Sequence, residues 1–182
     1  MDIKIDVKRK NIIINENGEK EIISNDTSLE EFKKLECFKN FEKDSGAFYK
    51  DPMIGFKSSV KYDGTSLGIY FVFDSEINKF KYMKIKLFGI FISKEQYKQL
   101  EKYLSEITDG LYDEPKIVRY LCKQFPDMPD KTLIRDDFYI GVYFDYYGGQ
   151  SDYTTCYSCI DFQEHSYSQF EEKLKEEMQN NI

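Results

Sequence analysis

Acidic and tyrosine residues are concentrated in one stretch of the 182-residue chain, from Asp136 to Glu172. This stretch holds eight Asp and Glu residues and no Lys or Arg, so its formal charge is −8, against −7 for the whole chain. The rest of the chain is almost neutral, with 26 basic and 25 acidic residues. Carboxylates grouped in this way can attract a basic partner, bind a divalent cation, or act as general acid and base.

Metal binding or catalysis would have to use Asp136 and Asp137 together with Asp145 or Asp161. Adjacent Asp residues are common before a strand, and no ordered cation-binding signature such as an EF-hand loop accompanies them. No glycine-rich loop has the spacing of a phosphate-binding or dinucleotide-binding motif. We therefore predict no catalytic residue, no metal site and no cofactor, and a carboxylate-dependent enzyme ranks third among the functions considered.

Two cysteines in the same stretch, Cys156 and Cys159, raise the question of a zinc or redox site. A structural zinc site needs four ligands, and His165 is the only histidine in the chain. On a strand, residues three apart also point to opposite faces. We therefore predict two free thiols, and we expect His165 to be a surface residue rather than part of a nucleophilic arrangement.

Two strands must position the tyrosines and aspartates, the first over 138–147 and the second over about 153–162, joined by a Gly-Gly-Gln-Ser-Asp turn. Side chains alternate along a strand. The alternation predicts an inner face made by Phe138, Ile140, Val142, Phe144, Tyr146, Thr154, Cys156, Ser158, Ile160 and Phe162. It predicts an outer face and adjoining turn that bind a partner through Tyr139, Tyr143, Asp145, Tyr147, Asp152, Tyr153, Tyr157 and Asp161.

Tyrosine suits such a binding face because it combines a large rigid contact area with a polar tip. Neighbouring carboxylates would steer a basic protein and raise its association rate. The alternative is that helices cover this face, so that the tyrosines belong to the core and satisfy their hydroxyls locally.

The rest of the chain contains patterns for further strands and for helices. We expect strands within 1–24, 56–62, 67–74 and 80–92, with tight turns at Asn17-Gly18 and Asp63-Gly64. Capping boxes predict helices that begin at Ser28 and at Ser93, the second ending near Asp109-Gly110. Apolar spacing predicts two more helices, over about 114–124 and 166–179.

These elements come in blocks rather than in strict alternation. The pattern favours an α+β fold with a mostly antiparallel β-sheet and three to four helices packed on it, in a single domain over residues 1–182. Met1 is followed by alternating residues and not by a basic and then apolar leader, which indicates no signal peptide. No apolar run approaches the length of a transmembrane helix, so we expect a cytoplasmic protein without a membrane partner.

Net acidity argues against direct binding to nucleic acid, because phosphate contacts require Lys and Arg. In its size, acidity and aromatic content the chain resembles the small cytoplasmic immunity proteins of bacterial polymorphic or contact-dependent toxin systems. The likeness is carried by the stretch from Asp136 to Glu172, with a second similarity at Ser66-Leu-Gly-Ile-Tyr-Phe-Val-Phe-Asp74. It implies a non-enzymatic inhibitor of a basic toxin, such as a nuclease. The alternative is a phage-encoded antagonist of host defence or another protein-interaction module.

Overall fold

The fold is described from a computed structural model. The described residues are 1–44, 52–87, 92–114, 117–119, 130–135, 138–146 and 154–162. None of the described helices is long and apolar enough to cross a membrane.

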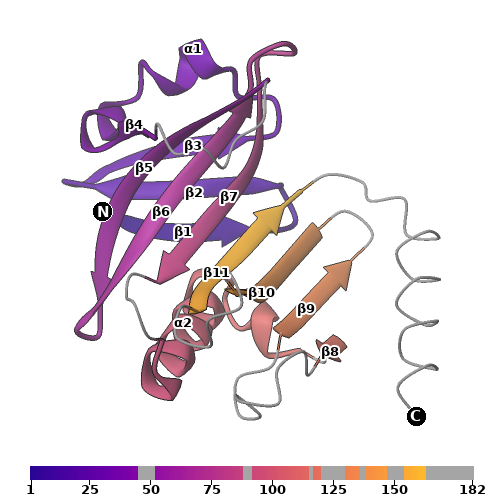
Figure 1. The fold of residues 1–182 in the computed structure, drawn as a ribbon. Coiled ribbons are helices and arrows are strands. Elements are labelled where there is room, and N and C mark those ends of the chain that lie inside the picture. Colours follow the sequence, from indigo (N-terminus) through magenta and orange to yellow (C-terminus); the bar gives the residue numbers. More distant parts are fainter. Residues whose placement is uncertain are drawn as a thin grey trace.

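The described strands form two antiparallel sheets (Figure 1). The small sheet has the order β1 (Asp2–Asp6), β2 (Asn11–Glu16), β3 (Glu19–Ser24). The large sheet has the order β4-β5-β6-β7-β11-β10-β9-β8. Its strands are β4 (Glu42–Asp44), β5 (Met53–Tyr62), β6 (Thr65–Asp74), β7 (Lys79–Leu87), β8 (Ile117–Arg119), β9 (Asp130–Arg135), β10 (Phe138–Tyr146) and β11 (Thr154–Asp161).

Two of the tight turns were predicted from sequence and are confirmed. Asn17 and Gly18 join β2 to β3 with φ of 52° and 85°, and Asp63 and Gly64 join β5 to β6 with φ of 45° and 80°. Positive φ at both central residues is the type I′ geometry that matches the twist of a hairpin, and Gly adopts it without a steric penalty.

Both predicted capping boxes are also present. Ser28 caps α1 (Leu29–Phe32) and exchanges hydrogen bonds with Glu31, while Ser93 caps α2 (Lys94–Ile107) and does so with Gln96. In each case the serine hydroxyl accepts from the backbone N–H three residues on, which satisfies a donor that the first turn leaves open. Two short 3-10 helices follow, η1 (Glu36–Asn40) and η2 (Leu111–Asp113).

The prediction of three to four helices packed on the sheet is wrong. In the described ranges there are two α-helices, and only α2 is longer than seven residues. The helix expected from Ser28 stops after four residues, because the Glu21 carboxylate of β3 accepts the backbone N–H groups of Glu36 and Cys37 (2.6 and 2.8 Å) and a separate turn begins there. The described chain is therefore mainly antiparallel β-structure.

The prediction of a helix over 114–124 is also wrong for residues 117–119. Ile117–Arg119 form β8, which pairs with β9. Ile117 and Val118 are β-branched, and the available sheet edge favours the extended conformation over their helical spacing. The helix expected over 166–179 lies outside the described residues.

An aromatic cluster joins α1 and η1 to one face of the large sheet, which we call the inner face. The ring of Phe32 is fully buried and lies 5.0 Å from that of Phe73 and 5.6 Å from those of Phe56 and Phe71, measured between ring centroids. Buried isoleucines of the small sheet belong to the same core. The small sheet and α1 therefore cover the inner face.

Helix α2 covers the inner face further along the sheet. The ring of Tyr103 packs against that of Tyr62 of β5 at a tilt of 56° with centroids 5.0 Å apart, and the Glu101 carboxylate lies 2.5 Å from the Lys131 ammonium of β9. Gln99 accepts a hydrogen bond from Thr65 of β6. Helices α1 and α2 thus both contact the inner face. We call the opposite face of the large sheet the outer face.

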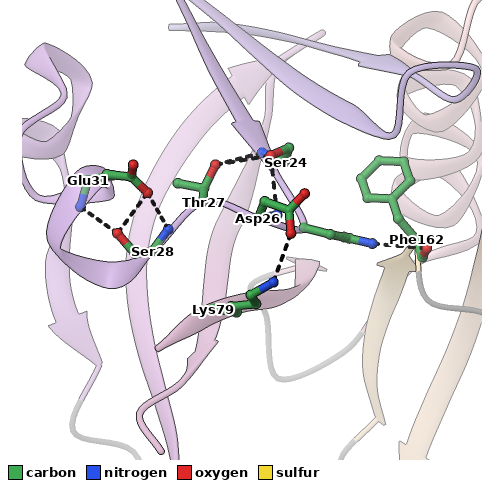
Figure 2. Close-up of polar contacts among 8 residues, drawn as sticks. Ser24, Asp26, Thr27, Ser28, Glu31, Lys79 and Phe162 are labelled. Atoms are coloured by element: carbon green, nitrogen blue, oxygen red, sulfur yellow. Dashed lines mark hydrogen bonds and ion pairs between the residues drawn. The ribbon is translucent and has the colours of Figure 1, made fainter. Parts of the chain in front are cut away.

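The segment between β3 and α1 ties the small sheet to β7 and β11 (Figure 2). The Lys79 ammonium lies 2.8 Å from the Asp26 carboxylate, and the backbone N–H of Phe80 donates to the Thr27 carbonyl (2.9 Å). The Asn25 amide donates to the carbonyl of Phe162 at the end of β11 (3.1 Å). Two of these contacts hold β7 and one holds the end of β11 against the segment that follows the small sheet.

Candidate protein-binding face

Strands β10 and β11 bring predicted binding residues to one face of the large sheet. Their antiparallel register pairs Tyr139 with Asp161, Tyr143 with Tyr157, and Asp145 with Thr155. Directly opposed residues on neighbouring strands point to the same side. We call the set Tyr139, Tyr143, Asp145, Tyr157 and Asp161 the Tyr/Asp face.

The predicted division of this hairpin into two faces is confirmed for the described side chains. Ile140, Val142, Cys156, Ser158 and Ile160 are all fully buried on the inner face. Asp161, on the outer face, is half-buried. The inner residues therefore anchor β10 and β11 to the core, which fixes the orientation of the Tyr/Asp face.

The structure describes the side chains of only some of the predicted binding residues. Tyr147, Asp152 and Tyr153 lie outside the described residues. For Tyr139, Tyr143, Asp145 and Tyr157 the backbone register is described and the side chains are not. The register establishes that these residues belong to one face of the sheet. That this face is exposed stays a prediction.

Strand β7 adds residues that the sequence analysis did not assign to the site. It pairs with β11, and this places Tyr82 opposite Asp161, Lys84 opposite Cys159, and Lys86 opposite Tyr157. All three are half-buried. Lys84 and Lys86 alternate with the buried residues of β7 and therefore point outward, but only the strand order reveals that they adjoin the Tyr/Asp face.

The resulting surface carries charges of both signs. Asp145 and Asp161 lie on the β10–β11 side, and Lys84 and Lys86 lie on β7 beside it. The next row continues the basic side, because Tyr70 of β6 stands between Lys84 and Lys57 of β5. From β5 to β10 the outer face therefore changes from basic to acidic, while Glu42 of β4 lies beside Lys57 at the far edge. The charge of the stretch 136–172 alone did not suggest this pattern.

The outer face is more enclosed towards β6. Val72 is fully buried and Tyr70 is 8% exposed, although both alternate with inward-facing residues of the same strand. On β7 and β11 the outward residues Lys84 and Asp161 are half-buried instead. The partly exposed polar side chains of the outer face therefore lie along β7 and β11, whereas Thr132 of β9 is again buried.

Cys159 sits in the middle of this surface, opposite Gly141. Burial, and then the Asp161 carboxylate, raise the pKa of its thiol to about 12. The thiol is therefore protonated at neutral pH and is not an activated nucleophile, because the thiolate is the reactive form. The same burial, with Cys159 and Asp161 as smaller causes, raises the pKa of Tyr82 to about 12.

Cys156 and Cys159 do not act together. Cys156 is fully buried on the inner face and Cys159 is half-buried on the outer face, so the strand separates them as expected. Within the described ranges, no group of three or more His, Cys, Asp or Glu side chains could hold a metal ion. His165, Asp136 and Asp137 lie outside the described residues, so the prediction that they form no metal or catalytic site is left standing as a prediction.

The chain was compared with known proteins at three levels. No family model, no curated protein and no solved structure matches it.

Proposed function

We propose that the protein is a non-enzymatic inhibitor that binds a cognate bacterial toxin in the cytoplasm, in the manner of an immunity protein. The observation that carries the proposal is the β10–β11 register, which gathers three tyrosines and two aspartates on the sheet face opposite the core. Tyrosines presented by a rigid sheet offer contact area at a low entropy cost, which is typical of binding hot spots.

The mixed charge of the outer face indicates which charges a partner would carry. A basic group of the toxin would face Asp161, and an acidic group would face Lys84 and Lys86 one strand away. Charges arranged in this order fix the orientation of a complex and discourage wrong partners, because a shifted partner would oppose like charges. A nuclease domain with a basic active-site surface and an acidic flank fits this pattern.

The test uses the protein encoded by the neighbouring gene as the candidate toxin. Co-expression with the chain should protect cells from it, and the purified proteins should bind. Asp161→Lys should slow association and weaken binding by about tenfold at low salt, with a smaller loss at high salt because screening reduces the repulsion. Stopped-flow association and equilibrium titration at several salt concentrations measure both effects.

The control is Glu76→Lys, an equal change of charge at an exposed residue between β6 and β7. It should leave the equilibrium affinity nearly unchanged. A neighbouring protein that is neither toxic nor bound would overturn the immunity proposal, and a neighbourhood of phage genes would favour the antagonist of host defence. Equal losses of affinity in the two variants would show that the Tyr/Asp face is not part of the interface.

A further inference from the structure

A second polar site lies at the other end of the large sheet, where β4 leaves the edge of β5. Strand β4 pairs with β5 only over Glu42–Asp44, and the cleft beside its first residue measures about 520 Å³. It is lined by Lys39, Asn40, Phe41, Glu42, Lys57, Ser58, Ser59 and Tyr70. A cleft of this volume is in the range that holds small-molecule ligands.

One tyrosine, Tyr70 of β6, lines the cleft and is 8% exposed. Because Tyr70 lines the cleft, its hydroxyl can donate a hydrogen bond to a polar ligand atom placed there. Burial is the largest cause that raises the pKa of Tyr70, so the hydroxyl is protonated at neutral pH and can donate.

The cations in the cleft indicate what that ligand atom would be. Lys57 stands opposite Tyr70 in the β5–β6 register, and Lys39 of η1 lines the same cleft. Their ammonium groups already lie 3.2 Å from Glu42 and 3.3 Å from Glu36, respectively. Both carboxylates are well exposed, so a bound anion can replace them at little cost in buried charge.

Smaller groups complete an anion-binding arrangement. Ser59 stands opposite Gly68, which has no side chain to fill the space beside Tyr70 on the same strand. Ser58 and Ser59 also line the cleft, and Ser59 is on the same face of β5 as Lys57, so its hydroxyl can donate a further hydrogen bond there. The lining thus offers donors of several kinds and one carboxylate, that of Glu42, while the Asp44 carboxylate lies near enough to Tyr70 to raise its pKa.

We propose that this cleft binds the oxyanion group of a small molecule, a phosphate or a carboxylate, through the Tyr70 hydroxyl and the Lys57 ammonium. The site is independent of the Tyr/Asp face and of the proposed inhibitor function. Charge-assisted hydrogen bonds from Lys and Tyr to an oxyanion are stronger than those between neutral groups, which gives the cleft its selectivity for anions.

The test titrates isotope-labelled protein with inorganic phosphate, and separately with acetate, at constant ionic strength, and follows backbone amide shifts. Saturable shifts confined to the residues around Lys57, Ser59 and Tyr70 are expected for at least one anion. The anion that saturates identifies the ligand as a phosphate or a carboxylate. Tyr70→Phe and Lys57→Met should each weaken binding about tenfold, since each removes one hydrogen bond to a charged group.

Two further variants separate a site from general charge attraction. Glu42→Gln should tighten binding, because its carboxylate competes with the ligand for Lys57. Lys79→Met removes the same charge from an ion pair outside the cleft and should change nothing. Thermal unfolding confirms that each variant is folded. Shifts that never saturate for either anion, or equal losses in Lys57→Met and Lys79→Met, would overturn the proposal.

Discussion

At the residue scale, two buried hydroxyl groups differ in their surroundings. The Thr108 hydroxyl donates to the Leu104 carbonyl (2.7 Å) and accepts from the Tyr112 backbone N–H (3.1 Å). The Ser158 hydroxyl is fully buried on the inner face of β11 and has no hydrogen-bond partner among the residues that the structure describes. The Thr108 hydroxyl therefore stabilises the end of α2. The Ser158 hydroxyl instead costs stability, because Ser158 stands between the apolar residues Val142 and Ile85 on the neighbouring strands.

Ser158→Ala is therefore expected to leave the free energy of unfolding unchanged or to raise it by up to about 1 kcal/mol, because an unsatisfied polar group is removed from the core. Thr108→Val is the matched comparison and should lower it by about 1–2 kcal/mol, because it leaves the Tyr112 N–H unpaired. Urea unfolding measures both. A Ser158→Ala variant that is clearly less stable would show that the hydroxyl has a partner.

At the element scale, local signals in the sequence predicted the turns and helix starts better than the helix ends. The capping serines and the Asn-Gly and Asp-Gly turns act within four residues, so the sequence contains all of the groups involved. The end of α1 depends on Glu21, which is distant in sequence from Glu36. Similarly, β8 exists because β9 offers it a pairing edge, and helical spacing contains no information about that edge.

The cap of α2 gives a prediction at this scale. Ser93→Ala should lower the free energy of unfolding by about 1 kcal/mol, because the Gln96 backbone N–H loses its acceptor at the first turn. The control Lys98→Ala, at an exposed position of the same helix, should have an effect within about 0.5 kcal/mol. Chemical denaturation followed by far-ultraviolet circular dichroism measures the difference. Equal stability of the two variants would contradict a contribution from the cap.

At the scale of the whole molecule, strand order decides what the candidate face contains. The separation of inner from outer residues in β10 and β11 follows from alternation, and it is confirmed for the described side chains. The placement of Lys84 beside Cys159 depends on β11 pairing with β7, a contact between segments about seventy residues apart. No local pattern encodes such a pairing, so the mixed charge of the outer face could not be predicted from the sequence.

The number of enclosed tyrosines makes the fold as a whole sensitive to alkaline pH. Burial is the largest cause that raises the pKa of Tyr62, Tyr103 and Tyr112 above the ordinary range, and it raises that of Tyr82 to about 12. In the unfolded chain these hydroxyls would ionise near pH 10. The unfolded state therefore holds fewer protons than the folded state above that pH, and the free energy of unfolding must fall as pH rises.

We expect the urea midpoint to be steady from neutral pH to about pH 8 and then to decline towards pH 12, because the Cys159 thiol and the enclosed tyrosines ionise at lower pH in the unfolded chain than in the folded protein. Tyrosinate absorbance should show two groups of residues: one that ionises normally, and one that ionises only as near-ultraviolet circular dichroism is lost. In denaturant all tyrosines should ionise together. A midpoint that does not change between pH 9 and pH 12 would contradict the enclosure of these side chains, and with it the packing of α2 against β5 through Tyr62 and Tyr103.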